Sequence, residues 1–596
     1  TLSKTLINVD SNKAIFSFKL LEKVEPQLLP ESINKLMSHE IEEVRDFAQL
    51  KMNELKGLSV SDRYVIAQKT NGEDKVKRNI VSGGDILDLF KSGDISRTRL
   101  FRLCKSENPE DRQYAAELIS NTNDDDNISL LIELLNDVNP KVRKTAIKTA
   151  QKKFNEEVLN ALIDNLAYSA YSVEAANALS IIGGKALNAL DTCFYKSGQS
   201  SHTMLKIIQV IGRIGGNKAK QQLWGKMDFP DKVIVSEVLL ALANTGFRAG
   251  MTQIPRIKYA IETDVEHIAW NMAAISEVSN EQFGSDIKRA LEEEISADID
   301  HIYMLLSMLY DAQSIQLVKE NIESGTSEGS IYAIELLDVF LSEDLKQKVI
   351  PVLDDLPYAE KTKKLEIFYP RDRLNNKLIL KFLLNRDFSQ INRWTKACVL
   401  YQIGLLKIAD YKLDLIANLF NPDTLINEMA AWALHEIDEV EYAANVLRLP
   451  YKKRKHLDSL VLHSNESKNT LGFEKVLFFE KMDAFSGVSG ISVARVVDIV
   501  DLLVLDEGEM LSVDEQYNDN FYIVYDGSIN IYENGKVSGM TKKGEFIGEL
   551  MKSSSYMKSN LIIAIEPTVL FKLNKDSFYE LLSDNVKLAQ KIVEFV

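Results

Sequence analysis

Side chains that could carry out metal, nucleophilic or phosphate chemistry are scattered along this sequence of 596 residues. It contains no GxxxxGK[ST] phosphate loop, no HExxH metal motif and no GxSxG nucleophile turn. The pair His435-Glu436 stops short of a metal motif, because Glu439 stands where the second histidine is needed. The run NTNDDDN at 121–127 lacks the glycine and the final glutamate of a calcium loop, so we expect a polar turn there. These observations predict a protein that is not an enzyme.

One pair of residues stands in a more informative setting. Gly548 and Glu549 begin a predicted helical turn inside the segment 508–564, where short apolar stretches alternate with turns. Glu549 could contact a ligand, or it could only stabilise the first turn of its helix through the free N–H groups there. The turns are expected at Asp526-Gly527, Asn534-Gly535 and Lys543-Gly544. This pattern predicts a compact antiparallel barrel or jelly roll that positions the Gly-Glu pair.

The segment from residue 473 to 596 resembles a cyclic nucleotide-binding domain. The pair Phe478-Phe479 and the helix after it are similar to the family's helical lead-in, and Gly508-Glu509 is expected to open the barrel. The stretch FYIV at 521–524, followed by Asp526-Gly527, resembles the family's strand-turn-strand. Residues 576–596 resemble the terminal helices that cover the ligand in family members. The resemblance implies an α+β fold, with a β jelly roll and flanking helices, and cAMP or cGMP as ligand.

The resemblance also implies particular site residues. In this family a short helix after a Gly-Glu pair directs backbone N–H groups at the cyclic phosphate, the glutamate binds the ribose 2′-hydroxyl, and an arginine neutralises the phosphate. The arginine position, nine residues after Glu549, is occupied here by Lys558, and the position often held by Thr or Ser is Leu561. The expected ligand-binding residues are therefore Phe546, Ile547, Gly548, Glu549, Leu550, Met551, Lys558, Ser559, Asn560 and Leu561.

Lys558 weakens this expectation. Lysine keeps the positive charge but lacks the planar fork that holds two phosphate oxygens. The change would remove about 1 to 3 kcal/mol, which lowers affinity by about one to two orders of magnitude. Lys558 could equally be an exposed loop lysine, and the barrel would then have lost ligand binding.

The first 455 residues are dominated by apolar positions spaced for helices, and they contain repeats. Asn108-Pro109 with Arg112 is repeated as Asn139-Pro140 with Arg143, and Ile182-Gly183-Gly184 as Ile214-Gly215-Gly216. Looser copies occur at 267–278, 330–340, 393–404 and 427–438. Each unit can bury its apolar face only against a neighbouring unit, which predicts an all-α solenoid. The number of repeats after residue 250 stays open.

The phrase PKVRKTAIKTA resembles HEAT repeats. In that family an Asp near the turn and an Arg on the following helix form a ladder between repeats. Asp137 and Arg143 match both positions, whereas Arg45 and Arg112 match the arginine position alone. The solenoid could grip a partner protein, or it could only hold the terminal domain at a distance.

Composition narrows the partners and the setting. A net charge of -16 argues against nucleic acid as the main partner, and Lys452–His456 is expected to be a solvated run in a linker. Cys104, Cys193 and Cys398 give neither a disulfide framework nor a zinc site, so we expect buried thiols in the cytoplasm. No apolar run is long enough to span a bilayer. The chain begins with Thr1, which suggests a fragment or a processed product.

The sequence thus predicts a HEAT-like α-solenoid at 1–455, a linker at 456–472 and a cyclic nucleotide-binding-like domain at 473–596. The expected function is regulatory, with cyclic nucleotide binding coupled to a protein partner on the solenoid and no cofactor or metal. The alternative is an interaction scaffold with a non-binding barrel. The combination also resembles the cytoplasmic tail of bacterial carriers similar to nucleotide translocases, which would place a membrane domain upstream and this chain at the inner membrane.

Overall fold

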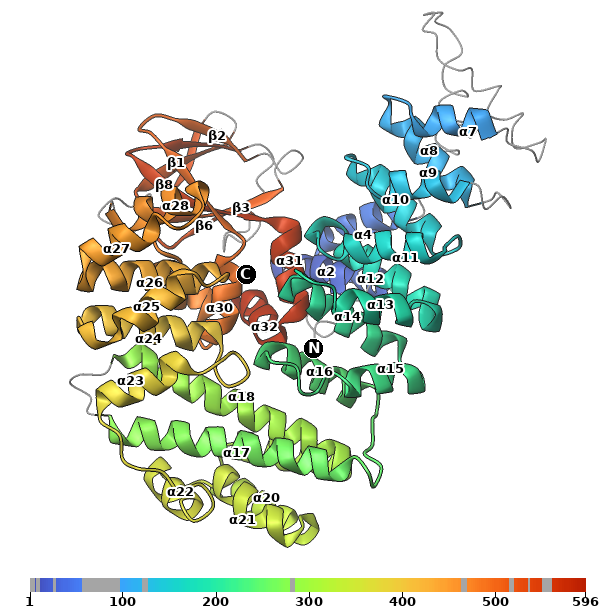
Figure 1. Cartoon of the computed structure of the whole chain (residues 1–596). Coiled ribbons are helices and arrows are strands. Elements are labelled where there is room, and N and C mark those ends of the chain that lie inside the picture. The colour runs from blue at the N-terminus through green and yellow to red at the C-terminus, as the bar shows by residue number, and fades with distance from the viewer. Residues whose placement is uncertain are drawn as a thin grey trace, which may run out of the picture. The chain divides into compact units, whose positions relative to one another are not determined.

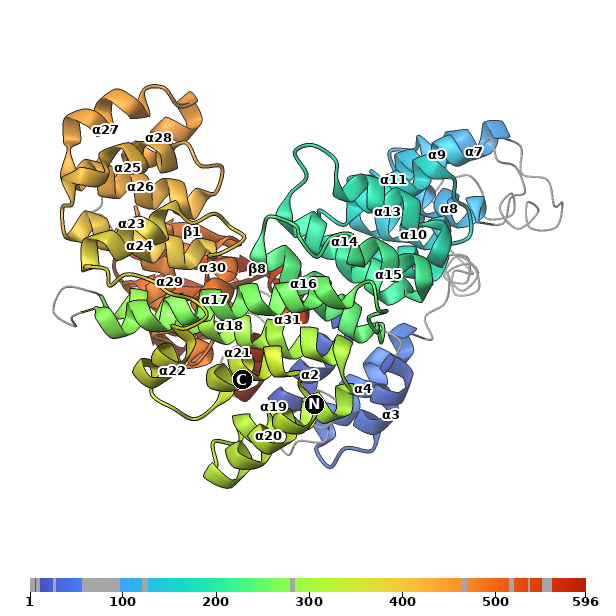
Figure 2. The same ribbon diagram turned by 60° about the horizontal axis from the view of Figure 1, so that its bottom comes forward.

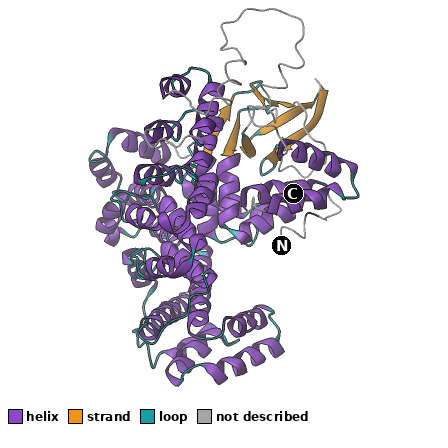
Figure 3. Ribbon diagram, turned by 90° about the vertical axis from the view of Figure 1, so that its right-hand side faces the viewer, coloured by secondary structure: helices purple, strands orange, loops and turns teal. Residues whose placement is uncertain are grey.

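The computed structural model describes residue 6 and residues 11–24, 28–55, 97–120, 127–278, 284–462, 469–513, 519–533, 536–548 and 560–595. The chain forms two compact units, residues 1–222 and 223–595, each described here by itself. Helices dominate both units (Figure 1), and the strands gather in one part of the second (Figure 3). The predicted fold class, a helical array followed by a β domain with flanking helices, is confirmed.

The first unit is built from short helices. They are α2 (Ser11–Val24), α3 (Leu29–Met37), α4 (Glu42–Leu55), α7 (Arg97–Cys104), α8 (Pro109–Ile119), α9 (Ile128–Leu134), α10 (Pro140–Ala150), α11 (Glu156–Asn165), α12 (Ser169–Ile182), α13 (Leu187–Phe194), α14 (Ser201–Ile214) and α15 (Gly216–Trp224), which runs across the boundary between the units. The repeated Asn-Pro phrase begins α8 and α10. Asn108 and Asn139 each accept a backbone N–H of the first turn, from Glu110 and Lys141 respectively, and proline occupies the first helical position.

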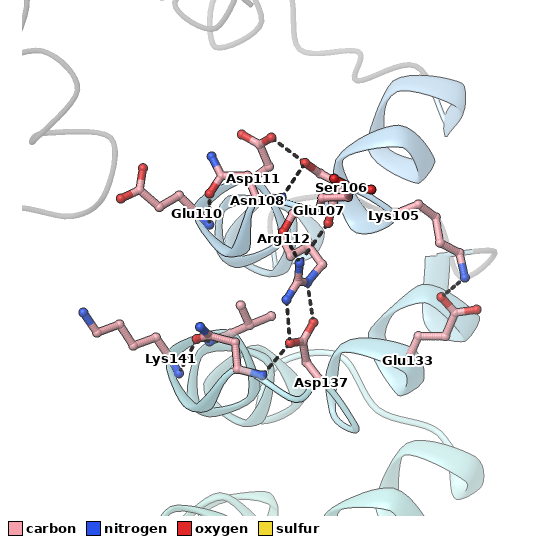
Figure 4. A network of polar contacts seen from close by, with 12 residues as sticks. Lys105, Ser106, Glu107, Asn108, Glu110, Asp111, Arg112, Glu133, Asp137 and Lys141 are labelled. Atoms are coloured by element: carbon pink, nitrogen blue, oxygen red, sulfur yellow. Dashed lines mark hydrogen bonds and ion pairs between the residues drawn. The ribbon is translucent and has the colours of Figure 1, made fainter. Parts of the chain in front are cut away.

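The predicted ladder between repeats is present (Figure 4). Arg112 of α8 donates two hydrogen bonds to Asp137 of the next repeat, Nε to Oδ2 at 2.6 Å and Nη2 to Oδ1 at 3.0 Å. Asp137 also accepts the backbone N–H of Asn139 at 2.8 Å. Burial raises the pKa of Asp137, but the hydrogen bonds from Arg112 and Asn139 outweigh it, so the pKa lies below its usual value. The pair of Arg112 and Asp137 therefore fixes the distance between two successive repeats.

The next rung uses a different acceptor. Arg143 donates from Nε to Asn165 Oδ1 at 2.7 Å, and its guanidinium lies over the rings of Tyr168 and Tyr171. Asn165 is fully buried, and its side-chain N–H also donates to the Leu135 carbonyl of the preceding repeat at 3.1 Å. A neutral amide can serve here because the aromatic faces supply the remaining stabilisation of the cation.

The second unit continues with helices, two of which are much longer than a repeat predicts. α16 (Lys232–Asn244) precedes α17 (Ile254–Glu277) and α18 (Ser285–Leu309), which have 24 and 25 residues and lie side by side (Figures 1 and 2). Glycine is absent from both, and the only proline stands at the start of α17, where a helix tolerates it. They are followed by α19 (Ala312–Glu323), α20 (Ser327–Phe340), α21 (Glu343–Leu353), α22 (Tyr358–Leu365), α23 (Asn376–Asn385), α24 (Arg393–Leu405), α25 (Lys412–Leu419), α26 (Thr424–Ile437), α27 (Glu439–Val446) and α28 (Tyr451–Leu462).

The looser repeat phrases all lie on helices, namely α17, α20, α24 and α26. The basic run 452–456 differs from its expected setting, because it belongs to α28 and not to an extended segment. Leu457, Leu460 and Val461 are buried at helical spacing, which extends α28 through residues 456–462 of the predicted linker.

The C-terminal part consists of four helices and two antiparallel sheets. The helices are α29 (Gly472–Glu480), α30 (Gly490–Val497), α31 (Lys575–Asp584) and α32 (Val586–Phe595). One sheet has the strand order β1-β8-β3-β6 and the other β2-β7-β4-β5. The strands are β1 (Val500–Leu505), β2 (Met510–Ser512), β3 (Asn520–Asp526), β4 (Ser528–Glu533), β5 (Lys536–Lys542), β6 (Phe546–Ile547), β7 (Asn560–Ala564) and β8 (Thr568–Asn574).

The barrel begins earlier than predicted. We expected the helical lead-in to run to Leu503 and the barrel to open at Gly508, but α30 ends at Val497 and β1 pairs with β8 from Val500 to Leu505. A short apolar run such as VDLLVL fits a buried helix or a strand equally well, and only its pairing partner decides between them.

Two of the three predicted turns lie in the described residues and have the expected backbone. Gly527 and Gly544 have φ of +85°, between β3 and β4 and between β5 and β6. A Cβ at Gly527 would also lie 2.6 Å from Thr568 Oγ1, so the turn needs glycine for space as well. The third turn, Asn534-Gly535, lies outside the described residues. Between the sheets, the barrel core is filled with apolar side chains: Leu505, Val513, Tyr522, Val524, Ile529, Ile531, Ile547, Ile562, Ala564 and Leu570.

Candidate functional site

Strand β6 leads into the predicted ligand-binding turn. Phe546 and Ile547 pair with Ile523 and Tyr522 of β3, and both side chains are buried. Gly548 follows with φ of +106°, a conformation that favours glycine. The strand therefore ends where the sequence predicts the start of a helical turn.

Several predicted site residues lie outside the described residues: Glu549, Leu550, Met551, Lys558 and Ser559. The segment 549–559 connects β6, at the edge of one sheet, to β7, which lies between β2 and β4 of the other. Asn560 begins β7 opposite Glu533, and Leu561 pairs with Ser512 and Tyr532. Because side chains alternate along a strand, Leu561 points away from the core, which its neighbour Ile562 enters. The structure thus fixes both ends of the predicted cassette.

The terminal helices approach the same end of β6. Phe595 of α32 packs on Phe546, with ring centroids 5.2 Å apart, and Phe578 of α31 packs on Phe521 at 5.7 Å. A Cβ at Gly548 would lie 3.9 Å from the Phe521 ring. Aromatic contacts therefore connect the paired strands β6 and β3, next to Gly548, to both terminal helices.

The helical lead-in packs on the outer face of the first sheet. Phe571 of β8 lies between Phe479 of α29 and Tyr525 of β3, stacked at 5.5 Å and 4.6 Å respectively. Phe478 contacts both Tyr525 and Phe571 edge to face. The predicted Phe-Phe pair thus joins the lead-in helix to the barrel.

The same lead-in is built into the helices before it. Gly490, the first residue of α30, donates its N–H to Glu293 Oε2 of α18 at 2.9 Å. A Cβ at Gly490 would lie 1.9 Å from Trp394 Nε1 of α24, so α30 rests directly on that indole. Burial raises the pKa of Glu293 to about 7, although the hydrogen bond from Gly490 opposes this.

Charged pairs surround this contact. Arg393 bridges Asp498, after α30, and Asp423, before α26, and Arg289 of α18 pairs with Glu480 of α29. Glu428 of α26 accepts the Gly472 N–H at 2.8 Å through one oxygen and contacts His456 at 2.8 Å through the other. Glu428 is only 6% exposed, so these bonds tie the first turn of α29 to α26 and α28.

A row of aromatic rings completes the junction. Phe473 of α29 stacks on Trp394 at 5.0 Å and tilts against Tyr401 at 4.5 Å, and Tyr401 stacks on Trp432 of α26 at 5.2 Å. The sequence reading missed this junction, because its residues belong to no motif and lie up to about 200 positions apart. Gly490, the first residue of α30, was the local signal of a close approach.

The three cysteines have the burial that the sequence predicts. Cys104, Cys193 and Cys398 are buried and free, and burial raises the pKa of Cys104 to about 11. Among the described helices, none combines the length and the apolar character needed to cross a membrane. The calcium-like run 121–127 lies outside the described residues except for Asn127.

Comparison with known proteins assigns two regions. The family model of HEAT repeats matches residues 98–183, and that of the cyclic nucleotide-binding domain matches residues 502–585. No curated protein matches the chain.

Solved structures similar to this chain include the sensor domain of the transcriptional regulator DNR from Pseudomonas aeruginosa, at 20% identity, covering 21% of this chain and 86% of that one with a TM-score of 0.18. A cyclic nucleotide-binding domain from Methylobacillus flagellatus KT is 21% identical over 20% of this chain and 71% of that one, with a TM-score of 0.18. The catabolite activator protein of Thermus thermophilus is 16% identical over 19% and 55%, with a TM-score of 0.17. By the family models, the chain is thus similar to HEAT repeats over residues 98–183 and to the cyclic nucleotide-binding domain over residues 502–585.

Proposed function

We propose that this chain is a non-enzymatic regulatory protein. Its C-terminal domain binds cAMP or cGMP in the cassette 546–561, and the bound state is transmitted to the helices that precede the domain. The observation that carries the proposal is the row of direct contacts that links the end of β6 to α18 and α24.

The first step of this row lies within the domain. A ligand held at Gly548 and Glu549 would bear on the end of β6, where Phe546 contacts Phe595 of α32. Asn585, between α31 and α32, donates to Ser492 of α30 at 2.6 Å. A shift of the terminal helices on ligand binding would therefore reach α30.

The second step leaves the domain. α30 rests with Gly490 on Trp394 and Glu293, and Trp394 is fully buried. A close-packed contact of this kind cannot deform gradually, so a displaced α30 has to repack or undock. A ligand that binds the two arrangements with different affinity would shift their populations.

Calorimetric titration of the full chain with cAMP and with cGMP tests the binding step. The expected result is a saturable heat that is lost or weakened by about 10- to 100-fold in Glu549→Ala, because one charge-assisted hydrogen bond to the ribose is removed. The matched control is Glu507→Ala, which removes an exposed carboxylate from the β1–β2 turn. No heat at millimolar ligand, or an unchanged affinity in Glu549→Ala, would refute the binding mode.

Hydrogen exchange tests the coupling step separately. Ligand should change the protection of the amides in α30 and in the first turn of α24, while those of α8 and α10 keep theirs. Binding without any change at α30 would leave a binding domain but would exclude this route of transmission.

A second candidate function is an interaction scaffold whose barrel no longer binds nucleotides. It is favoured by the lysine at position 558 and by the leucine at position 561. Under this candidate, the wild type gives no heat, and Lys558→Arg combined with Leu561→Thr creates binding. A double variant that also stays silent would mean that the pocket is closed for other reasons.

We also propose a protein partner for the solenoid. Large apolar side chains are exposed on helices of the second unit, including Val339, Leu413, Val440 and Tyr451, each more than 60% exposed. Cross-linking of the full chain in its native host, with and without cyclic nucleotide, would detect such a partner. If no cross-links to these helices form under either condition, the proposed partner is refuted.

A further inference from the structure

A buried polar cluster lies between α16, α17 and α18, away from the cassette. Asp264 of α17 and Asp298 and His301 of α18 each direct one ligand-type atom into a common space, where these atoms lie within 4.8 Å of one another. Asp298 is fully buried, and His301 is 4% exposed. Asp298 and His301 are three residues apart, which places them on the same face of α18.

The hydrogen bonds of His301 define its tautomer. Ser236 Oγ donates its proton to the Lys232 carbonyl at 2.8 Å, so it must accept the bond that joins it to His301 Nε2 at 2.6 Å. His301 Nε2 therefore carries the ring proton. In the neutral ring with its proton on Nε2, Nδ1 presents a lone pair.

This lone pair faces a carboxylate. His301 Nδ1 lies 4.0 Å from Asp264 Oδ1, beyond hydrogen-bonding distance. Asp298 Oδ2 is buried and has no hydrogen-bond partner among the described residues. Unpaired acceptors in a buried site are costly unless a cation satisfies them.

The charge count points in the same direction. Lys232 Nζ lies 2.6 Å from Glu294 Oε2 and 2.7 Å from Asp298 Oδ1, and the Arg386 guanidinium acts on the same two carboxylates. With Asp264, three carboxyl groups lie around two cationic side chains. Lys232 occupies Oδ1 of Asp298 and leaves Oδ2 to another cation.

We propose that Asp264, Asp298 and His301 bind one divalent first-row transition-metal ion, best matched by Zn²⁺. Imidazole together with carboxylate oxygen suits zinc, whereas Mg²⁺ and Ca²⁺ prefer an all-oxygen shell. Zinc ligands at about 2.1 Å lie about 3.4 Å apart in a tetrahedron, so the three ligand atoms, now within 4.8 Å of one another, must approach each other by up to about 1.4 Å. Ser236 holds the outer nitrogen of His301, as the second partner of a metal-bound imidazole usually does.

A cavity reaches one ligand of the site, and an ion bound there would join the helices around it. A cavity of about 620 Å³ reaches His301 and is lined also by Lys232, Ser236 and Glu294. The ion would clamp α17 to α18, and through His301 and Ser236 it would hold α16 as well. Three protein ligands leave one position for water, so the metal is expected to be exchangeable.

Metal analysis of the full chain tests the proposal. After EDTA treatment and dialysis, titration with Zn²⁺ should bind one ion per chain and raise the melting temperature, whereas Mg²⁺ and Ca²⁺ should do neither. Co²⁺ in place of Zn²⁺ should give visible absorption bands typical of nitrogen and oxygen ligands. Failure of Zn²⁺ to bind, or equal binding of Mg²⁺, would overturn the proposal.

Variants locate the site. Asp264→Asn should weaken Zn²⁺ binding by at least about tenfold, and because Asp264 is the most exposed of the three ligands this variant is expected to fold. His301→Gln should change the Co²⁺ spectrum by removing the nitrogen ligand. Asp300→Asn, on the same helix but paired outward with Lys319, is the control and should keep full stoichiometry. Undiminished binding in Asp264→Asn and His301→Gln would place the metal elsewhere and refute the assignment.

Discussion

Replacing Gly490 with alanine should loosen the C-terminal domain from the helices before it. The new Cβ would lie 1.9 Å from Trp394 Nε1, 2.4 Å from Cδ1 and 2.5 Å from Cε2, whereas ordinary contacts begin near 3.4 Å. Trp394 cannot move aside, because it is fully buried and stacked on Phe473. The start of α30 must therefore retreat by about 1.5 Å, which also breaks the bond from Gly490 to Glu293.

The size of the effect follows from these two losses. Overpacking costs about 1 to 3 kcal/mol, and the lost hydrogen bond to a carboxylate costs about 1.5 to 3 kcal/mol. The compact unit from Leu223 to Phe595 has an unfolding entropy of about 0.8 kcal/mol per kelvin at about 2.1 cal/mol/K per residue. If the unit unfolds cooperatively, its melting temperature should fall by about 3 to 8 °C.

Scanning calorimetry of the full chain measures this shift, and hydrogen exchange locates it at α30 and α24. The matched control is Gly539→Ala in β5, where an added Cβ meets no atom within 4 Å, so a change below about 0.5 kcal/mol is expected. A melting temperature and an α30 exchange rate that both stay at wild-type values in Gly490→Ala would refute the argument that α30 is held by close packing on Trp394.

Three further outcomes are expected. Asp137→Asn should destabilise the first unit by about 2 to 4 kcal/mol at pH 7, since it leaves the Arg112 guanidinium without its carboxylate. Because the native pKa of Asp137 is lowered, the extra stability of the wild type over this variant should be present above about pH 4 and fade as the pH falls further. Urea denaturation at several pH values measures both effects. The pKa of Glu293 is raised to about 7, so the free energy of unfolding falls as the pH rises from about 4.5 to 7. Glu293→Gln should therefore be more stable than wild type by up to about 3 kcal/mol at pH 8 and equally stable at pH 4, as measured by thermal denaturation at the two pH values. A stability difference that does not depend on pH would contradict this. Phe595→Ala should weaken cyclic nucleotide binding several-fold without abolishing the barrel fold seen by circular dichroism, and an unchanged affinity would separate α32 from the site.

Local signals predicted the local structure well. The Asn-Pro phrase gave the first residues of α8 and α10, and the Asp-Gly and Lys-Gly pairs gave two turns of the barrel, because caps and left-handed glycines act within a few residues. The resemblance to HEAT repeats predicted a ladder to which Asp137 and Arg143 contribute, and the structure pairs Asp137 with Arg112. The pairing of Arg143 with Asn165 was not predicted, since two tyrosines brought by the fold make the amide sufficient.

Contacts between distant segments could not be predicted from one sequence. Nothing in the residues around Glu293 or Trp394 indicates that they meet Gly490, because their partners lie about 100 to 200 positions away. The first strand, β1, was assigned to a helix for the same reason, since its pairing with β8 decides its conformation. In the cassette, the structure describes Gly548 at the end of β6, whereas the roles given to Glu549 and Lys558 stay predictions for titration.

The aromatic row at the junction also bears on the order in which the chain folds. Trp394, Tyr401 and Trp432 precede Phe473 in the sequence, so a ribosome delivers α24 and α26 before the ring that covers them. Until α29 arrives, the growing chain presents an uncovered aromatic face, which is the kind of surface that chaperones bind and that leads to aggregation. Synthesis that stalls between residues 432 and 473 should therefore produce an aggregation-prone intermediate. A C-terminal domain made without the preceding helices would in turn expose the Phe473 ring of α29.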